Sequence, residues 1–223
     1  MSRLVVKVGG AVATASAARV LELVDAGHEV CVVHGAGPQI TDEMERRGLP
    51  VEFVAGRRVT TAEGLQVVRE CLARVNDALC EALGSRAVPL FGDEIGLLAE
   101  PAPGLGLVGD AVPSRPEAVV EALAAGWIPV VAPLAEGPLN VNADEAAAAI
   151  AIGIGADRIL FATDVPGLLL EGCVVSRIET DEADRLLGAG ELEGGIVPKL
   201  RAAVVAARLG VRAEIGETVV VEG

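Results

Sequence analysis

The stretch Leu4-Val5-Val6-Lys7-Val8-Gly9-Gly10, close to the start of the chain, decides the fold. Four of the five residues before the glycines are apolar, which is typical of a strand that is buried on both faces. Lys7 interrupts this run, and two glycines end it. A cation that a buried strand carries into a glycine turn is costly unless an anion binds beside it. The stretch therefore predicts an anion site at the end of a central strand.

The rest of the chain alternates helix and strand patterns, as a parallel sheet requires. Three times a predicted helix stops at a glycine and a strand follows almost at once, at Gly27, Gly126 and Gly210. Two capping boxes, at residues 60–63 and 114–117, predict the starts of further helices. Residues 87–110 predict a hairpin or small meander that projects from the sheet, and residues 166–178 predict a hairpin around Glu171-Gly172. The expected class is α/β.

Helices and strands are expected in the following ranges. The helices are predicted at 16–26, 39–47, 60–83, 114–125, 145–154, after 180, and at 198–209. The strands are predicted at 4–8, 29–34, 51–54, 127–132, 158–162, 211–215 and 218–221.

Composition excludes several classes of protein. The chain has 223 residues, 52% of them hydrophobic and only 2% aromatic, so its core must consist of Ala, Val, Leu and Ile. No apolar run reaches the length of a membrane span, and the chain enters its first strand without a signal peptide. A net charge of −14 argues against nucleic acid and anionic membranes as partners. The cysteines lack metal-ligand spacing and predict buried free thiols in a reducing cytoplasm; they are Cys31, Cys71, Cys80 and Cys173.

The chain contains 18 basic residues, but only Lys7 and Lys199 are lysines. The lysine ammonium is a compact point charge, whereas the arginine guanidinium is a broad fork. We therefore favour the interpretation that these two positions need an ammonium group over the alternative that the two lysines merely remain in a composition biased toward arginine. Pro198 fits the first position of a helix, which places Lys199 in its first turn. A cation there opposes the helix dipole by roughly 0.3–1 kcal/mol. A bound anion would reverse that sign, whereas a solvated lysine would tolerate the cost.

Ligands of open α/β sheets bind beyond the carboxyl ends of the strands. Residues 7–10, 34–37, 140–144 and 163–164 are expected there. Glycine lets main-chain N–H groups approach a phosphate, although tight turns need glycine too. Asn140, Asn142 and Asp144 share one face of an extended segment, so one of them could cap the next helix while the others contact a ligand. His34 is interpreted as a hydrogen-bonding residue and not as a base.

Seven motifs, in this order, resemble the amino acid kinase family over nearly the whole chain: VVKVGG, VVHGAGPQI, GRRVT, VVAPL, NVNADEAA, TDVPGLL and GGIVPK. The resemblance implies a three-layer αβα sandwich with a mainly parallel central sheet. It implies one domain over residues 1–223, with a lobe for the amino acid substrate at about 1–140 and a nucleotide lobe at 141–223. It also implies a cytoplasmic homodimer, or a hexamer built from dimers.

Within the family, the chain is most similar to members that transfer the γ-phosphoryl group of MgATP to the side-chain carboxylate of N-acetyl-L-glutamate in arginine biosynthesis. The resemblance implies that Lys7 and Lys199 stabilise the phosphoryl group and that Asp144 orients them. The implied substrate residues are Ala36, Gly37, Arg58 and Asn140. The implied nucleotide residues are Gly9, Gly10, Gly35, Thr163 and Asp164. No protein-held metal is expected, because Mg²⁺ arrives on ATP.

Two other functions stay open. A related kinase could act on a carrier-linked or N-acetylated aminoadipate in lysine biosynthesis, although a chain of charge −14 would repel an acidic carrier protein. A non-catalytic sensor of amino acids or nucleotides could use the same fold, although both lysines are present.

The chain departs from the family pattern in four places. Ala36 replaces a glycine, residues 91–94 lack the usual glycine–serine–aspartate pattern, and the end after Gly210 is short. No extra helix precedes the first strand, so we expect a dimer without arginine feedback.

Overall fold

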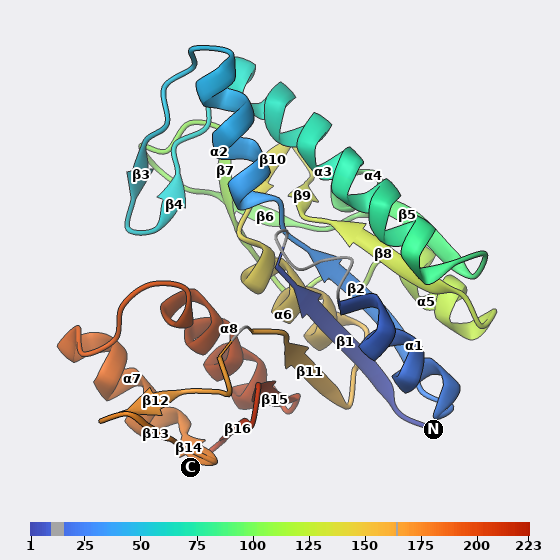
Figure 1. Ribbon diagram of the computed structural model, residues 1–223, viewed down its shortest axis with the longest axis vertical. Helices are drawn as coiled ribbons and strands as arrows, with labels where there is room; N and C mark the ends of the chain where they lie inside the picture. Colours follow the sequence, from blue (N-terminus) through green and yellow to red (C-terminus); the bar gives the residue numbers. More distant parts are fainter. Residues whose placement is uncertain (10–15, 164) are drawn as a thin grey trace.

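A mainly parallel sheet forms the centre of the computed structural model, which describes residues 1–9, 16–163 and 165–223. Within these ranges the sheet has eight strands in the order β14-β16-β15-β11-β1-β2-β8-β5, and all neighbours are parallel except β15 and β16. β1 (Arg3–Val8) lies between β2 and β11, near the middle of the sheet (Figure 1). The other strands are β2 (Glu29–His34), β5 (Ala87–Phe91), β8 (Ile128–Ala132), β11 (Arg158–Phe161), β14 (Arg177–Glu179), β15 (Arg212–Ile215) and β16 (Thr218–Val221).

Helices cover both faces of this sheet, which confirms the expected three-layer αβα class. Leu4, Val6 and Val8 pack into one core with α1 (Ala17–Asp25), α2 (Gly37–Arg46) and α3 (Ala62–Leu83). Val5 packs into the core on the opposite face, which α5 (Glu117–Ala124), α6 (Ala143–Gly153), α7 (Thr180–Ala189) and α8 (Ile196–Arg208) cover. The strand is therefore buried on both faces, as its apolar run predicts.

Smaller elements surround the carboxyl ends of the central strands. A second sheet has the order β6-β7-β10-β9, from β6 (Ala99–Pro101), β7 (Val108–Ala111), β9 (Leu134–Ala135) and β10 (Leu139–Val141). Two hairpins complete the set: β3 (Phe53–Val54) with β4 (Arg57–Arg58), and β12 (Leu169–Leu170) with β13 (Cys173–Val174). The second of these confirms the hairpin predicted around Glu171-Gly172.

The prediction for residues 87–110 was wrong in its first part. Ala87–Phe91 is not a projecting hairpin but the edge strand of the main sheet, paired with β8. Pro89 is tolerated because an edge strand has one side without ladder partners. A short helix, α4 (Gly92–Ile95), follows, and only β6 and β7 form the antiparallel pair that was expected.

Three helix starts also differ from the sequence prediction. α3 is capped by Thr61, whose Oγ1 accepts a hydrogen bond from the Gly64 amide at 3.0 Å. Ser114 caps nothing, because its hydroxyl donates to the Val112 carbonyl at 2.7 Å and accepts from the Leu98 amide at 3.0 Å. α8 begins at Ile196, two residues before the proline that was expected to open it.

The cysteines and the membrane prediction can be compared directly with the structure. All four cysteines are free, but only Cys31 and Cys71 are buried; Cys80 is half-buried and Cys173 is exposed, against expectation. Within the described ranges, every helix is too short or too polar to cross a lipid bilayer.

Candidate active site

Two lysines and one aspartate meet at the carboxyl end of β1. Lys7 is the residue before the last of this strand, and only 6% of its surface is exposed. Its Nζ lies 2.9 Å from Oδ1 of Asp144, in the first turn of α6. The Nζ of Lys199, from the first turns of α8, lies 3.9 Å from the same oxygen. Chain segments almost two hundred residues apart thus share one carboxylate.

The start of α6 fixes this carboxylate. Asn142 is the N-cap, and its Oδ1 accepts hydrogen bonds from the amides of Asp144 at 2.8 Å and Glu145 at 3.3 Å. This cap matches one of the two roles that the sequence left open for the Asn140–Asp144 segment. A negative charge in the first turn is also favoured by the helix dipole. The N-cap therefore positions Asp144 independently of its contacts with the two lysines.

Both lysines line one cleft of about 560 Å³. The end of the first strand and the start of the last long helix therefore share a cleft. Within the described residues, Asp144 is the one acidic side chain on its wall, while four cations line it. Positive charge is therefore concentrated along this cleft, although the protein as a whole is acidic. The predicted residues on this wall are Lys7, Gly9, Gly35, Ala36, Gly37, Arg58, Asn140, Asp144 and Lys199.

Arg58 enters the cleft from β4 and is held on several sides. Its Nη2 donates to Oγ1 of Thr41 at 2.6 Å and to the carbonyl of Gly37 at 3.2 Å. The guanidinium carbon lies 4.6 Å from the centre of the Phe53 ring. Burial lowers the pKa of the Arg58 guanidinium. A cation that is buried without a carboxylate partner among these contacts is well suited to bind a carboxylate of a ligand.

Asn140 lines the same wall and is held by Thr60, which is buried behind it. The amide Nδ2 of Asn140 donates to Oγ1 of Thr60 at 3.1 Å, and that hydroxyl donates to the Arg58 carbonyl at 2.9 Å. The substrate residues suggested by the resemblance are thus linked to one another. Thr41, Phe53 and Thr60 could not be identified from the sequence, because their spacing resembles that of ordinary helix, strand and cap residues.

The loop after β2 tolerates the alanine that replaces a family glycine. Ala36 is the N-cap of α2 with φ −142°, a conformation that carries no left-handed strain. A Cβ added at Gly37 would meet no atom within 4 Å, so the adjacent space is open. The glycine there keeps the backbone accessible from the cleft.

A second cleft of about 370 Å³ joins the first at Lys199 and Gly195. Thr163 lines it, and its apolar wall contains Val165, Leu168 and Leu192. Such a wall suits a flat aromatic base. Two predicted nucleotide residues, Gly10 and Asp164, lie outside the described residues.

His34 takes no place on either cleft wall. It ends β2 and is fully buried, and burial lowers the pKa of its imidazole to about 4, against an opposing effect of the Gly35 backbone. The ring is therefore neutral at pH 7. This position agrees with the interpretation that His34 is not the base of the reaction. The expected hydrogen-bonding role was wrong, because neither imidazole nitrogen has a partner in hydrogen-bond geometry among the described residues.

Comparisons with known proteins complete the description of the site. The sequence model of the amino acid kinase family matches residues 2–217. Acetylglutamate kinase from Rubrobacter xylanophilus is 42% identical over 224 residues, covering 96% of this chain and 88% of the relative. Acetylglutamate kinase from Methanopyrus kandleri is 42% identical over 229 residues, covering 93% and 92%. The crystal structure of smu.665 from Streptococcus mutans UA159 matches with a TM-score of 0.90 at 28% identity and covers 99% of both chains.

Proposed function

The chain belongs to the amino acid kinase family, and we propose that it transfers the γ-phosphoryl group of ATP to the side-chain carboxylate of N-acetyl-L-glutamate, in arginine biosynthesis. The observation that carries the proposal is the Lys7–Asp144–Lys199 cluster, which lies where the two clefts join. The names and identities of the relatives from Rubrobacter xylanophilus and Methanopyrus kandleri support the choice of acceptor.

The reaction needs little proton chemistry. The acceptor carboxylate is already ionised at neutral pH, so one of its oxygens attacks the γ-phosphorus while the bond to the β-phosphate oxygen breaks. The products are ADP and an acyl phosphate. Bringing two anions together is the main barrier, and fixed cations lower it most effectively in a partly buried site. Lys7 and Lys199 supply this charge, and Asp144 keeps both ammonium groups directed to one point.

The substrate is held by the wall opposite the lysines. The free edge of the Arg58 fork pairs with the α-carboxylate of N-acetylglutamate, and Asn140, Ala36 and Gly37 complete the contact. In this proposal residues 1–140 hold the amino acid and residues 141–223 hold the nucleotide. Gly9, Gly35 and Thr163 are proposed to contact the phosphates of ATP, and the same role stays a prediction for Gly10 and Asp164, which are outside the described residues.

Mg²⁺ fits this site as a companion of the nucleotide. Asp144 is the one carboxylate on the substrate cleft among the described residues, and two lysines already contact it. The described part of the substrate cleft therefore offers no set of oxygen ligands that would hold a metal without ATP. Mg²⁺ that arrived with the nucleotide would supply further charge neutralisation.

We also propose that the protein is a cytoplasmic homodimer without arginine feedback. Sedimentation of the purified chain tests the assembly, and a titration of the activity with L-arginine tests the regulation. A hexamer, or inhibition by arginine, would contradict the respective part of this proposal.

A hydroxamate assay tests the substrate, because hydroxylamine traps acyl phosphates. ATP-dependent product is expected with N-acetyl-L-glutamate and little with L-glutamate or N-acetyl-L-aminoadipate. Preference for the aminoadipate derivative would favour a role in lysine biosynthesis. A chain that binds these compounds but turns none of them over would instead be a sensor.

A further inference from the structure

The two arginines of β4 project from opposite faces of the β3–β4 hairpin and contact different elements of the fold. Arg57 and Arg58 are neighbours in a strand, so their side chains point to opposite faces. Arg58 contacts Thr41 on α2, whereas Nη2 of Arg57 donates to both carboxylate oxygens of Glu145 on α6, at 2.8 and 2.7 Å. Arg57 also forms an ion pair with Asp110 on β7. One residue thus joins the hairpin to two other elements.

Apart from these contacts and those of Arg58 with α2, the hairpin itself does little to fix its own position. Each of its strands has two residues, and such a ribbon is marginally stable on its own. Its turn contains Ala55 and Gly56 at positive φ, and Phe53 and Val54 on the other strand are exposed. Figure 1 shows the hairpin projecting from the main body of the fold, beside α2. Side-chain contacts therefore decide where Arg58 lies in the cleft.

The partner of Arg57 is the residue after Asp144. Glu145 lies in the first turn of α6, where the Asn142 cap fixes the backbone of both acidic residues. An ion pair from Arg57 to Glu145 consequently connects the part of the site that holds the substrate to the part that holds the lysines. Burial opposes the charge of Arg57, but the hydrogen bonds to Glu145 and Asp110 outweigh it and raise the pKa of Arg57, so the guanidinium stays charged at neutral pH.

We propose that Arg57 is a positioning residue for the substrate. It anchors the β3–β4 hairpin on α6 and β7, so that Arg58 meets the substrate carboxylate at a fixed place relative to the lysines. This inference rests on the proposed function. Isolated surface ion pairs contribute little, but Arg57 makes a two-oxygen contact plus a second ion pair, and its side chain is only 23% exposed.

Kinetics of three variants separate this role from direct binding of the substrate. Arg57→Met should raise KM for N-acetylglutamate about tenfold or more, because Arg58 is then misplaced, and should leave KM for ATP unchanged. The double variant Glu145→Gln/Asp110→Asn should raise KM for N-acetylglutamate by a similar factor. Adding Arg57→Met to this double variant should raise KM little further, because the ion pairs of Arg57 are already lost. If Arg57 itself bound the substrate, removing its carboxylate partners would leave KM unchanged or lower it, and the inference would fail.

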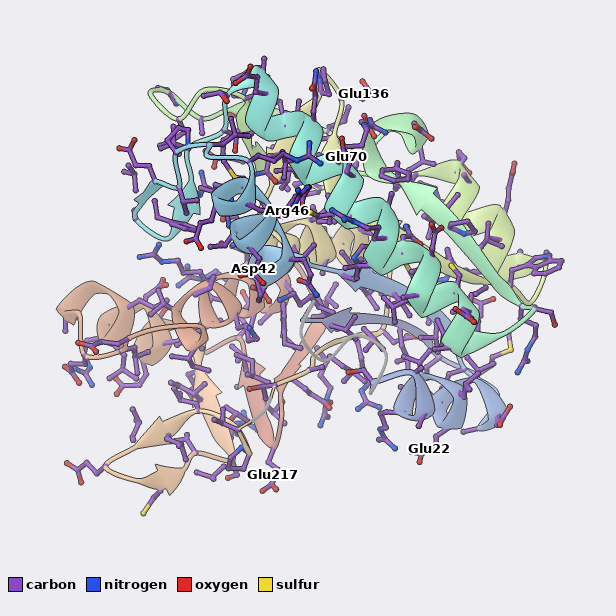
Figure 2. All side chains as sticks on the ribbon, turned by 45° about the horizontal axis from the view of Figure 1, so that its top comes forward. Glu22, Asp42, Arg46, Glu70, Glu136 and Glu217 are labelled. Carbon is purple, nitrogen blue, oxygen red and sulfur yellow. The ribbon has the colours of Figure 1, made fainter. Side chains whose placement is uncertain are left out.

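Arg47→Met is the matched control for the loss of a doubly paired arginine. Arg47 is 33% exposed and pairs with Glu43 and Glu70, which connects the end of α2 to α3 away from the cleft wall. Figure 2 labels Glu70 on α3, near Arg46 of α2. This variant should keep KM for N-acetylglutamate within about twofold of the wild type, since a residue distant from the cleft is not coupled to substrate binding.

Limited proteolysis gives a readout that does not depend on turnover. Phe53 is 52% exposed, so chymotrypsin should cut after it, and fragment masses identify that bond. Arg57→Met should speed this cleavage several-fold without any ligand, and Arg57→Lys should restore part of the protection. Equal cleavage rates in Arg57→Met and wild type would overturn the proposal that Arg57 anchors the hairpin. If wild type fails to phosphorylate N-acetylglutamate yet the variants still differ in cleavage, the proposed function is wrong and the anchor stands.

Discussion

At the scale of single residues, the active site depends on how charge is distributed around Asp144. Its side chain is 6% exposed, and the carboxylate has one ammonium at 2.9 Å and another at 3.9 Å. One negative charge thus offsets only half of the positive charge, and the remainder faces the junction of the two clefts. A transferring phosphoryl group would balance it. The lysines could be predicted from the sequence because only two exist and both interrupt recognisable elements.

Removing either lysine should affect the chemical step. Lys7→Ala and Lys199→Ala should each lower kcat by about 10²-fold or more, the usual effect of deleting one preorganised electrostatic donor. Steady-state kinetics with N-acetylglutamate and ATP measure this. Lys→Arg at the same positions is the control for charge alone, and it should restore little, since the larger fork does not fit a point between two anions. A variant with near-normal kcat would remove its lysine from the mechanism.

Thr41 should affect binding without affecting the chemical step. Its hydroxyl accepts the 2.6 Å hydrogen bond from Arg58, and such bonds to charged groups contribute roughly 1.5–3 kcal/mol. Thr41→Val should therefore raise KM for N-acetylglutamate about tenfold, with kcat nearly unchanged. Thr41→Ser keeps the hydroxyl and should stay close to wild type. Equal KM values for the two variants would show that Arg58 keeps its place without this contact.

His34 should make the folded state sensitive to acid. Burial lowers its pKa from 6.5 to about 4, so between these values the unfolded chain binds a proton that the folded chain does not. Its contribution to stability is therefore complete above pH 6.5 and is lost as the pH falls toward 4, by roughly 3 kcal/mol. Urea unfolding of His34→Leu should show a flatter pH dependence over this window. A wild-type stability that falls no more steeply over this window than that of His34→Leu would contradict the prediction.

At the scale of elements, the sequence predicted those whose signals are local. The helix of residues 62–83 and the β12–β13 hairpin follow from capping, periodicity and glycine. The edge strand β5 could not be predicted, because its pairing with β8 depends on a partner about forty residues away. Ser114 has the local pattern of a helix cap, but its hydroxyl bonds to the Val112 carbonyl and the Leu98 amide instead. Likewise, nothing local indicates that Arg57 reaches Glu145.

Gly153 should be essential for packing the end of α6. A Cβ there would lie 1.8 Å from the Ser114 carbonyl oxygen, which belongs to the backbone and must shift. Gly153→Ala should therefore lower the free energy of unfolding by about 1–3 kcal/mol, as overpacking does. Gly188→Ala in α7 is the matched control, because its Cβ meets no atom within 4 Å and should stabilise the helix by up to about 1 kcal/mol. Equal shifts of the urea midpoint in Gly153→Ala and Gly188→Ala would contradict this prediction.

At the scale of the whole molecule, the proposed division at residue 140 crosses shared structure. β1 and β11 come from different halves and pair along four register positions in the middle of the sheet. The core on one face combines Val5 and Val33 of the first half with Phe161 and Ala213 of the second. Neither half can keep its core when the other unfolds. The sequence suggested one domain from its motifs, but such cooperativity depends on this long-range packing.

The two halves should consequently unfold in one transition. Trp127, the single tryptophan, lies in the first half just before β8 and is 44% exposed, so its fluorescence reports that half. Circular dichroism reports helices of both. The two signals should give coincident urea curves, and each ligand should shift both curves together, because binding to either cleft stabilises the same cooperative unit. A dichroism step without a change in fluorescence would mean that α7, α8 and the strands around them unfold separately, and that the substrate half folds without them.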